Sequence, residues 1–146
     1  LSDLIHSYAT SNLYPEIIVS AKLTELVGLL LSNQGTSSAD VINSSIRYIE
    51  GHYPDPLSLE QMARQAGLSV SRFSALFKQE TGYSPHKYLL NTRLHASLPL
   101  LISTVTPVNE IALHIGFADA SSYIAAFRRK YSCTPLQYRI QNSLHQ

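Results

Sequence analysis

The stretch LSLEQMARQAGLSVSRFSALFKQETGYSPHKYL, residues 57–89, decides the fold because its pattern returns in TPVNEIALHIGFADASSYIAAFRRKYSCTPLQYR, residues 106–139. Up to the first glycine the offset between the two copies is 49, which pairs Gly67 with Gly116. One extra residue in the second copy then makes the offset 50. At that offset residue types agree at Phe77 and Phe127, Lys78 and Arg128, Pro85 and Pro135, and Tyr88 and Tyr138. The sequence therefore contains two copies of one supersecondary unit.

Each copy opens with a short helix that ends at a glycine. Ser58, followed three residues later by Gln61, has the form of a capping box, and Gly67 can adopt the left-handed conformation that ends a helix. In the second copy Pro107 is expected as the first helical residue, and Gly116 ends the helix. The two first helices are thus expected to stop at equivalent glycines.

A second, amphipathic helix follows in each copy, with Ser69 and Asp119 as the expected N-caps. Its apolar residues recur at helical spacing, so one narrow stripe is buried. These stripes are Phe73, Leu76 and Phe77 in the first copy, and Tyr123, Ala126 and Phe127 in the second. Helix, glycine turn and amphipathic helix make a helix-turn-helix, whose second helix is shaped to enter the DNA major groove. An αα-hairpin packed for stability alone would look similar, but it would not need the matched cations Lys78 and Arg128.

From about Asp40 to Arg139 the residues resemble the AraC-type (AraC/XylS) family of bacterial transcription regulators, specifically its C-terminal DNA-binding domain with two helix-turn-helix units. The resemblance is densest in residues 93–139. Matching positions are Arg93, Leu94, Leu100, Leu101, Thr104, Glu110, Ile111, Ala112, Gly116, Phe117, Asp119, Tyr123, Phe127, Arg128, Arg129, Pro135, Tyr138 and Arg139. The resemblance implies a promoter-binding transcription regulator with no catalytic activity.

The sequence departs from the family pattern at several positions. Many members carry arginine two residues before the phenylalanine of the second helix in each unit, where this chain has Ala75 and Ala125. Base reading must therefore rest on fewer hydrogen bonds. Serine replaces a usual glycine at position 132 and a usual alanine at position 97, and neither change is expected to threaten the fold.

The expected fold class is all-α: two helix-turn-helix subdomains, about 57–82 and 106–131, joined by a linker helix over about 85–103, with an extra N-terminal helical segment. Nineteen helical residues span roughly 28 Å, close to the spacing of about 34 Å between successive major-groove faces. Pro99 lies inside this helix, removes a backbone donor and crowds the carbonyl of His95. We therefore expect the helix to bend or be interrupted between His95 and Pro99.

Residues 38–146 are assigned to the DNA-binding domain, and 1–37 to a helical remnant of an upstream sensory or dimerisation region plus a linker. Residues 40–51 match the domain's first helix, with an apolar side that includes Ile42 and Ile49. The helix expected within residues 1–37 has an apolar stripe that consists of Leu23, Leu26, Val27 and Leu30. A helix that packs on its own domain is the alternative for this segment. The chain opens on Leu1 instead of methionine, which suggests a truncated piece.

Composition and charge agree with this interpretation. The 146 residues carry a net charge of only +1, but residues 40–146 hold ten Lys or Arg and seven Asp or Glu, a net +3. The single cysteine, Cys133, excludes an internal disulfide or multi-cysteine zinc site, and the six histidines have no metal-ligand spacing. We therefore expect no metal and no cofactor. No run of 18 apolar residues and no signal peptide occurs, so a cytoplasmic location away from the membrane is expected.

The DNA contacts divide into base reading and phosphate binding. The base-reading candidates on the two second helices are Ser71, Arg72, Ser74, Ala75, Ala120, Ser121, Ser122, Ile124 and Ala125. The phosphate candidates are Lys78, Lys87, Arg128, Arg129 and Lys130. Arg72 is the best candidate for a guanine, because a guanidinium can take O6 and N7 together, although a phosphate or surface role fits it equally.

Double-stranded DNA is the principal partner expected, with RNA polymerase and a homodimer formed through the N-terminal region as further partners. A small-molecule effector site is expected outside this chain. The alternative function is a protein-interaction module that uses the helical hairpins as a docking surface. An enzyme is disfavoured, since a DNA-repair protein with such a domain carries a zinc-binding cysteine cluster that this chain lacks.

Overall fold

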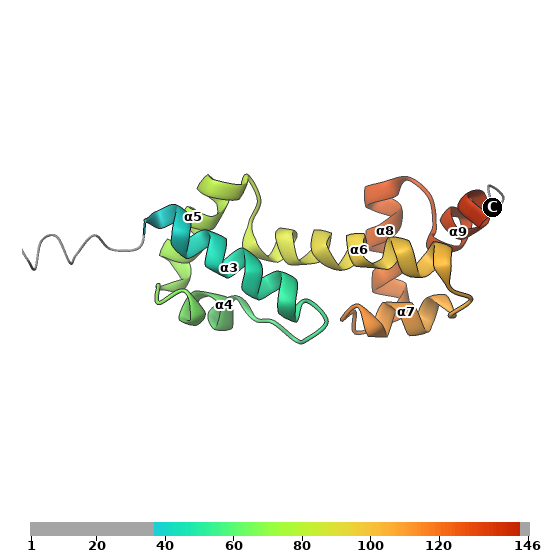
Figure 1. The fold of residues 1–146 in the computed structure, drawn as a ribbon, viewed down its shortest axis with the longest axis horizontal. Coiled ribbons are helices and arrows are strands. Elements are labelled where there is room, and N and C mark those ends of the chain that lie inside the picture. The colour runs from blue at the N-terminus through green and yellow to red at the C-terminus, as the bar shows by residue number, and fades with distance from the viewer. Residues whose placement is uncertain (1–36, 144–146) are drawn as a thin grey trace, which may run out of the picture. The chain divides into compact units, whose positions relative to one another are not determined.

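The computed structural model describes residues 37–143, and this part of the chain is all-helical (Figure 1). The predicted fold class is therefore confirmed. The helices are α3 (Ser38–His52), α4 (Leu59–Gln65), α5 (Val70–Thr81), α6 (Pro85–Ser103), α7 (Val108–His114), α8 (Ala120–Tyr131) and α9 (Pro135–Ser143). Of the described residues, 38–143 belong to one compact unit. The predicted N-terminal helix with its leucine stripe lies outside the described residues.

Two apolar cores lie along the single helix α6. The first core joins α3, α4, α5 and the beginning of α6 through Ile42, Ile49, Met62, Ala63, Phe73, Phe77 and Leu89. The second joins the rest of α6 to α7 and α8 through Leu94, Leu101, Ile111, Ala112, Ile115, Phe117, Tyr123, Ala126 and Phe127. Each unit thus buries the stripe predicted for its second helix, except that Leu76 is only partly buried, and α6 contributes to both cores (Figure 1).

The duplication extends to ring geometry. In the first unit the rings of Phe77 and Tyr88 meet edge to face, with centroids 5.5 Å apart and planes at 76°. In the second, Phe127 and Tyr138 meet at 5.6 Å and 74°. Because the pairs stand at the same offset, equivalent residues bring the helix after each unit, α6 or α9, against its second helix.

The glycine turns of the two units also share one hydrogen-bond pattern. Gly67 and Gly116 have φ of 67° and 91°, the left-handed conformation expected of them. Each turn has the two backbone bonds of a Schellman motif, in which the glycine N–H and the following N–H donate back into the helix. The bonds are Gly67 to Arg64 at 3.0 Å, Leu68 to Ala63 at 3.0 Å, Gly116 to Leu113 at 3.1 Å and Phe117 to Ala112 at 2.9 Å.

The start of the first helix agrees with prediction in one unit and differs in the other. Ser58 and Gln61 form both bonds of the capping box, at 3.1 and 2.8 Å. In the second unit Pro107 is the N-cap, with ψ of 145°, and α7 begins at Val108. The prediction that Pro107 is the first helical residue is thus wrong by one position. Pro107 occupies the place of Ser58 and has no side-chain acceptor, so α7 lacks a side-chain cap.

Helix α6 continues through Pro99 without a break (Figure 1). The expected interruption is therefore wrong, while a bend stays a prediction. Pro99 removes the N–H that would bond the His95 carbonyl, and both residues are exposed to solvent. Water can satisfy that carbonyl, which removes the main reason for the helix to end.

Ser132 ends α8 in the left-handed conformation, with φ of 61°, and its N–H donates to the Arg128 carbonyl at 2.9 Å. The equivalent residue in the first unit is Gly82, with φ of 77°. Among residues 37–143 Ser132 is the only non-glycine residue with positive φ. The fold tolerates this serine, as expected, but its Cβ makes the conformation unfavourable.

We expect Ser132→Gly to stabilise the domain by about 1 kcal/mol, the relief of left-handed strain less the entropy that glycine adds to the unfolded chain. The midpoint of thermal unfolding followed by circular dichroism should rise by about 4–8 °C. Gly82→Ser is the matched control and should lower it comparably, because nothing within 4 Å would obstruct its Cβ. Equal midpoints for wild type and Ser132→Gly would contradict the assignment of strain to this residue.

Candidate nucleic-acid interface

The second helices, α5 and α8, begin at caps of different charge. The Ser69 hydroxyl accepts the Arg72 backbone N–H at 3.3 Å. The Asp119 carboxylate accepts the Ser122 backbone N–H at 2.7 Å and the Ser122 hydroxyl at 2.9 Å. These bonds, led by the backbone one, lower the pKa of Asp119, which therefore stays ionised at the N-terminus of α8. The uncharged cap of α5 leaves that helix end better suited to a phosphate.

On α8 the structure brings most of the predicted residues onto one surface. Ser121, Ile124, Ala125, Arg128 and Arg129, together with Thr134, line a shallow hollow of about 610 Å³. Ala120 is half-buried and packs against the second core, so it is less accessible than the exposed base-reading candidates on α8. The hydroxyl of Ser122 is held by Asp119.

On α5 the exposed face is formed by Ser71, Arg72, Ala75 and Lys78, while Ser74 is half-buried. The opposite side of the helix carries Phe73 and Phe77, both completely buried. A helix anchored by two aromatic rings presents its polar side in one fixed rotation. The four exposed residues can therefore act together on one ligand surface.

The predicted cations differ in whether their side chains already have a hydrogen-bond or ring partner in the protein. Within residues 37–143 the side chains of Arg72, Lys78, Arg128 and Arg129 make no hydrogen bond or ion pair, so their charges are available to a ligand. Lys130 donates to the Asn91 side chain on α6 at 2.9 Å. It also lies 5.6 Å from the Tyr131 ring centroid, and partial burial lowers its pKa.

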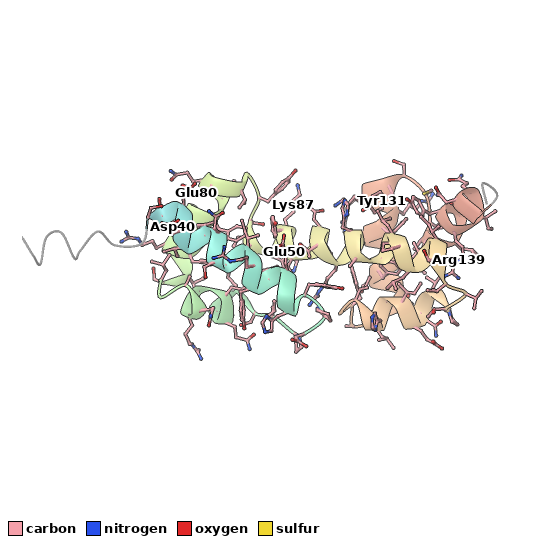
Figure 2. All side chains as sticks on the ribbon, viewed as in Figure 1. Asp40, Glu50, Glu80, Lys87, Tyr131 and Arg139 are labelled. Carbon is pink, nitrogen blue, oxygen red and sulfur yellow. The ribbon has the colours of Figure 1, made fainter. Side chains whose placement is uncertain are left out.

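Lys87, at the start of α6 (Figure 2), stands apart from both second helices, with its ammonium 5.4 Å from the Tyr83 ring centroid. Both Lys87 and Lys130 are exposed. Their ring contacts are weak at exposed sites, of order 0.5–1 kcal/mol. A phosphate could therefore compete with these contacts.

Two arginines with structural roles were not among the site residues predicted from the sequence. Both donate hydrogen bonds to backbone carbonyls of the protein itself. Arg93 donates to the carbonyls of Tyr53 and Asp55, at 2.7 and 2.8 Å. Arg139 (Figure 2) donates to those of Leu101 and Thr106, at 3.0 and 2.6 Å. The only sequence signal was their place in the family pattern, because a lone arginine otherwise reads as a solvated cation.

Among residues 37–143 none of the helices has the length and apolarity that crossing a bilayer requires. The same residues contain no group of three or more His, Cys, Asp or Glu side chains placed to hold a metal ion.

A helix-turn-helix domain family matches residues 62–141. The probable transcriptional regulator LumQ of Photobacterium leiognathi is 37% identical over 92 residues, which cover 63% of this chain and 37% of LumQ. The transcriptional activator RhaS of Escherichia coli O157:H7 is 32% identical over 103 residues, covering 70% of this chain and 37% of RhaS. A solved AraC-type regulator from Chromobacterium violaceum superimposes with a TM-score of 0.66 at 29% identity, covering 70% of this chain and 92% of that one.

Two short helices about a glycine turn, present twice and joined by one helix, define a DNA-binding fold of paired helix-turn-helix units. The chain belongs to the AraC-type family of bacterial DNA-binding transcription regulators. It spans about 37% of the length of LumQ and of RhaS.

Proposed function

We propose that this chain regulates transcription by placing α5 and α8 in two neighbouring major grooves of a promoter. The observation that carries the proposal is the pair of equivalent cations, Lys78 and Arg128. Each is exposed on the outer face of a second helix and is free of partners within residues 37–143. A duplicated hairpin that served packing alone would not need matched free charges on its solvent side.

In this mechanism cations set the register and the outer faces of the helices read bases. The phosphate contacts come from Lys78, Arg128 and Arg129, with Lys87 and Lys130 at the margins. Arg72 is the strongest candidate for a guanine contact, because its exposed guanidinium can donate to O6 and N7 together. Ala75 and Ala125 can touch a thymine methyl but cannot form a bidentate hydrogen bond.

The proposal assigns no catalytic role to the chain, in keeping with the regulators that it resembles. RNA polymerase and a second copy, joined through the N-terminal region, remain predicted partners, and an effector site is expected elsewhere. RhaS is an activator, and we extend that sign of regulation to this chain only as part of the proposal.

The proposal is tested by the salt dependence of binding to random-sequence duplexes of 20 and 10 base pairs. Five phosphate contacts predict a log–log slope of about −4.5 on the longer duplex. The slope should fall to about half on the shorter one, which has only one helical turn and cannot offer two successive groove faces. A slope near zero on both would instead favour a protein-interaction module, and equal steep slopes would contradict the use of both units.

A further inference from the structure

Three segments from different parts of the fold meet between the two units: the loop that joins α3 to α4, the middle of α6, and the glycine turn of the second unit. Figure 1 shows the α3–α4 loop reaching toward the second unit. Arg93 of α6 holds this loop from one side, with Nε 2.7 Å from the Tyr53 carbonyl and Nη2 2.8 Å from the Asp55 carbonyl. Gly116 of the second unit lies against the same loop, next to Arg93.

Gly116 lies so close to the loop that no side chain fits. A Cβ at this position would be 2.6 Å from the Pro54 carbonyl oxygen, 2.8 Å from that of Tyr53 and 2.9 Å from Nε of Arg93. The equivalent Gly67 has nothing within 4 Å. Left-handed φ is common to both glycines, so the close packing is an additional requirement at Gly116 alone. Backbone of the first unit therefore rests directly on the turn of the second.

The Tyr53 side chain reinforces this contact, because it packs against both apolar cores. Beside this contact the two units also leave space between them. A hollow of about 560 Å³ is lined by Ser58 of the first unit, by Phe117, Ser122 and Arg129 of the second, and by His86 and Arg93 of α6. The Tyr53, Arg93 and Gly116 contact therefore lies at the edge of this hollow, where backbone of the two units meets directly.

The chemistry at Arg93 suits a fixed geometry. Partial burial lowers its pKa, but a guanidinium remains charged in proteins. Its planar fork matches two carbonyls at once, whereas a lysine ammonium is a point charge on a flexible stem. The two bonds also satisfy carbonyls of a loop that lies outside any helix. Removing the guanidinium therefore releases the loop and weakens its contact with the Gly116 turn.

We propose that Arg93 is a positioning residue that, by clamping the α3–α4 loop onto the Gly116 turn, fixes the placement of α5 relative to α8. Its consequence for DNA rests on the proposed function: rigidly placed helices engage two grooves together at a high effective concentration. Without the clamp, the units are connected mainly by α6. The placement of one unit relative to the other must then be ordered when DNA binds.

The geometric part is tested without DNA, by electron–electron distance measurement between spin labels at Glu80→Cys on α5 (Figure 2) and Asn109→Cys on α7, in a Cys133→Ser background. Relative motion is the default for units with a small interface, so Arg93→Ala should broaden the distance distribution about twofold. Arg93→Lys should broaden it too, and it provides a milder variant if the alanine variant does not fold.

Arg139→Ala is the matched control. Arg139 forms the same two-carbonyl fork, but its partners Leu101 and Thr106 belong to the second unit. This variant should lower the melting temperature and leave the distance distribution as narrow as in the parent. Circular dichroism checks that Arg93→Ala and Arg93→Lys are folded. If the distance distribution of either folded variant is as narrow as that of Arg139→Ala, the proposal is overturned.

A DNA measurement then tests the consequence. Arg93→Ala should bind a 20-base-pair random duplex about tenfold more weakly and a 10-base-pair duplex equally well, since only two-groove binding needs fixed spacing. Equal losses on both lengths would contradict a positioning role. If wild type itself shows no length dependence, the proposed function fails, while the distance measurement still decides the clamp.

Discussion

Replacing Arg128 and Arg129 together by alanine is expected to flatten the log–log salt slope of DNA binding by about 1.8, two phosphate contacts at about 0.9 each. At 1 M salt such contacts contribute little, so the variant and the wild type should bind with similar affinity there. Over the tenfold change in salt down to 0.1 M, the difference in slope amounts to a loss of roughly 60-fold in affinity. Both side chains are exposed and make no bond within residues 37–143, so their removal should leave the fold intact. The measurement is fluorescence anisotropy of a labelled duplex over a series of salt concentrations.

The matched control is the double substitution Arg47→Ala and Arg64→Ala, which removes two exposed cations from α3 and α4 and changes net charge equally. It should change the slope much less, because these cations lie outside the outer faces of α5 and α8. An unaltered slope in the Arg128 and Arg129 variant would remove these residues from the phosphate set. Equal flattening in both variants would show that only overall charge matters.

Phe127→Ala is expected to have the largest effect on stability. The ring is completely buried and contacts three others, at centroid distances of 4.5 Å to Tyr131, 5.6 Å to Tyr138 and 5.7 Å to Tyr123. Truncating such a residue costs about 3–5 kcal/mol, a large part of the 5–15 kcal/mol by which domains are stable. Urea unfolding followed by circular dichroism gives the change directly.

The cavity left by Phe127→Ala would lie among the rings of Tyr123, Tyr131 and Tyr138. The hydroxyls of Tyr123 and Tyr131 are buried without a hydrogen-bond partner among the described residues, and burial raises the pKa of Tyr123 to about 12. Phe127→Leu is the control that keeps most of the volume, and it should cost clearly less than the alanine variant. A loss below about 1 kcal/mol in Phe127→Ala, within the range of an ordinary surface change, would show that this core can collapse around the cavity.

Much of the local structure could be predicted because its causes are local. The burial of Phe73 and Phe77, the Ser58 capping box and the left-handed Gly67 each depend on residues within four positions of one another. The one-residue error at Pro107 has the same origin, because proline is compatible with both the N-cap and the first helical position. Candidate DNA contacts on α5 and α8 followed from the same periodicity.

The sequence by itself thus determined two copies of a helix-turn-helix, the stripe that each second helix buries, and the outer face left for a ligand. Only the tertiary structure decided that α6 continues past Pro99. It also decided that Lys130 donates a hydrogen bond to the Asn91 side chain, and that Arg93 joins the α3–α4 loop to the Gly116 turn. These features depend on partners about 40 residues away in the sequence or on which side of a helix meets solvent. A contact between backbone carbonyls and a single distant side chain leaves no periodic trace, so it becomes visible only once the helices are packed.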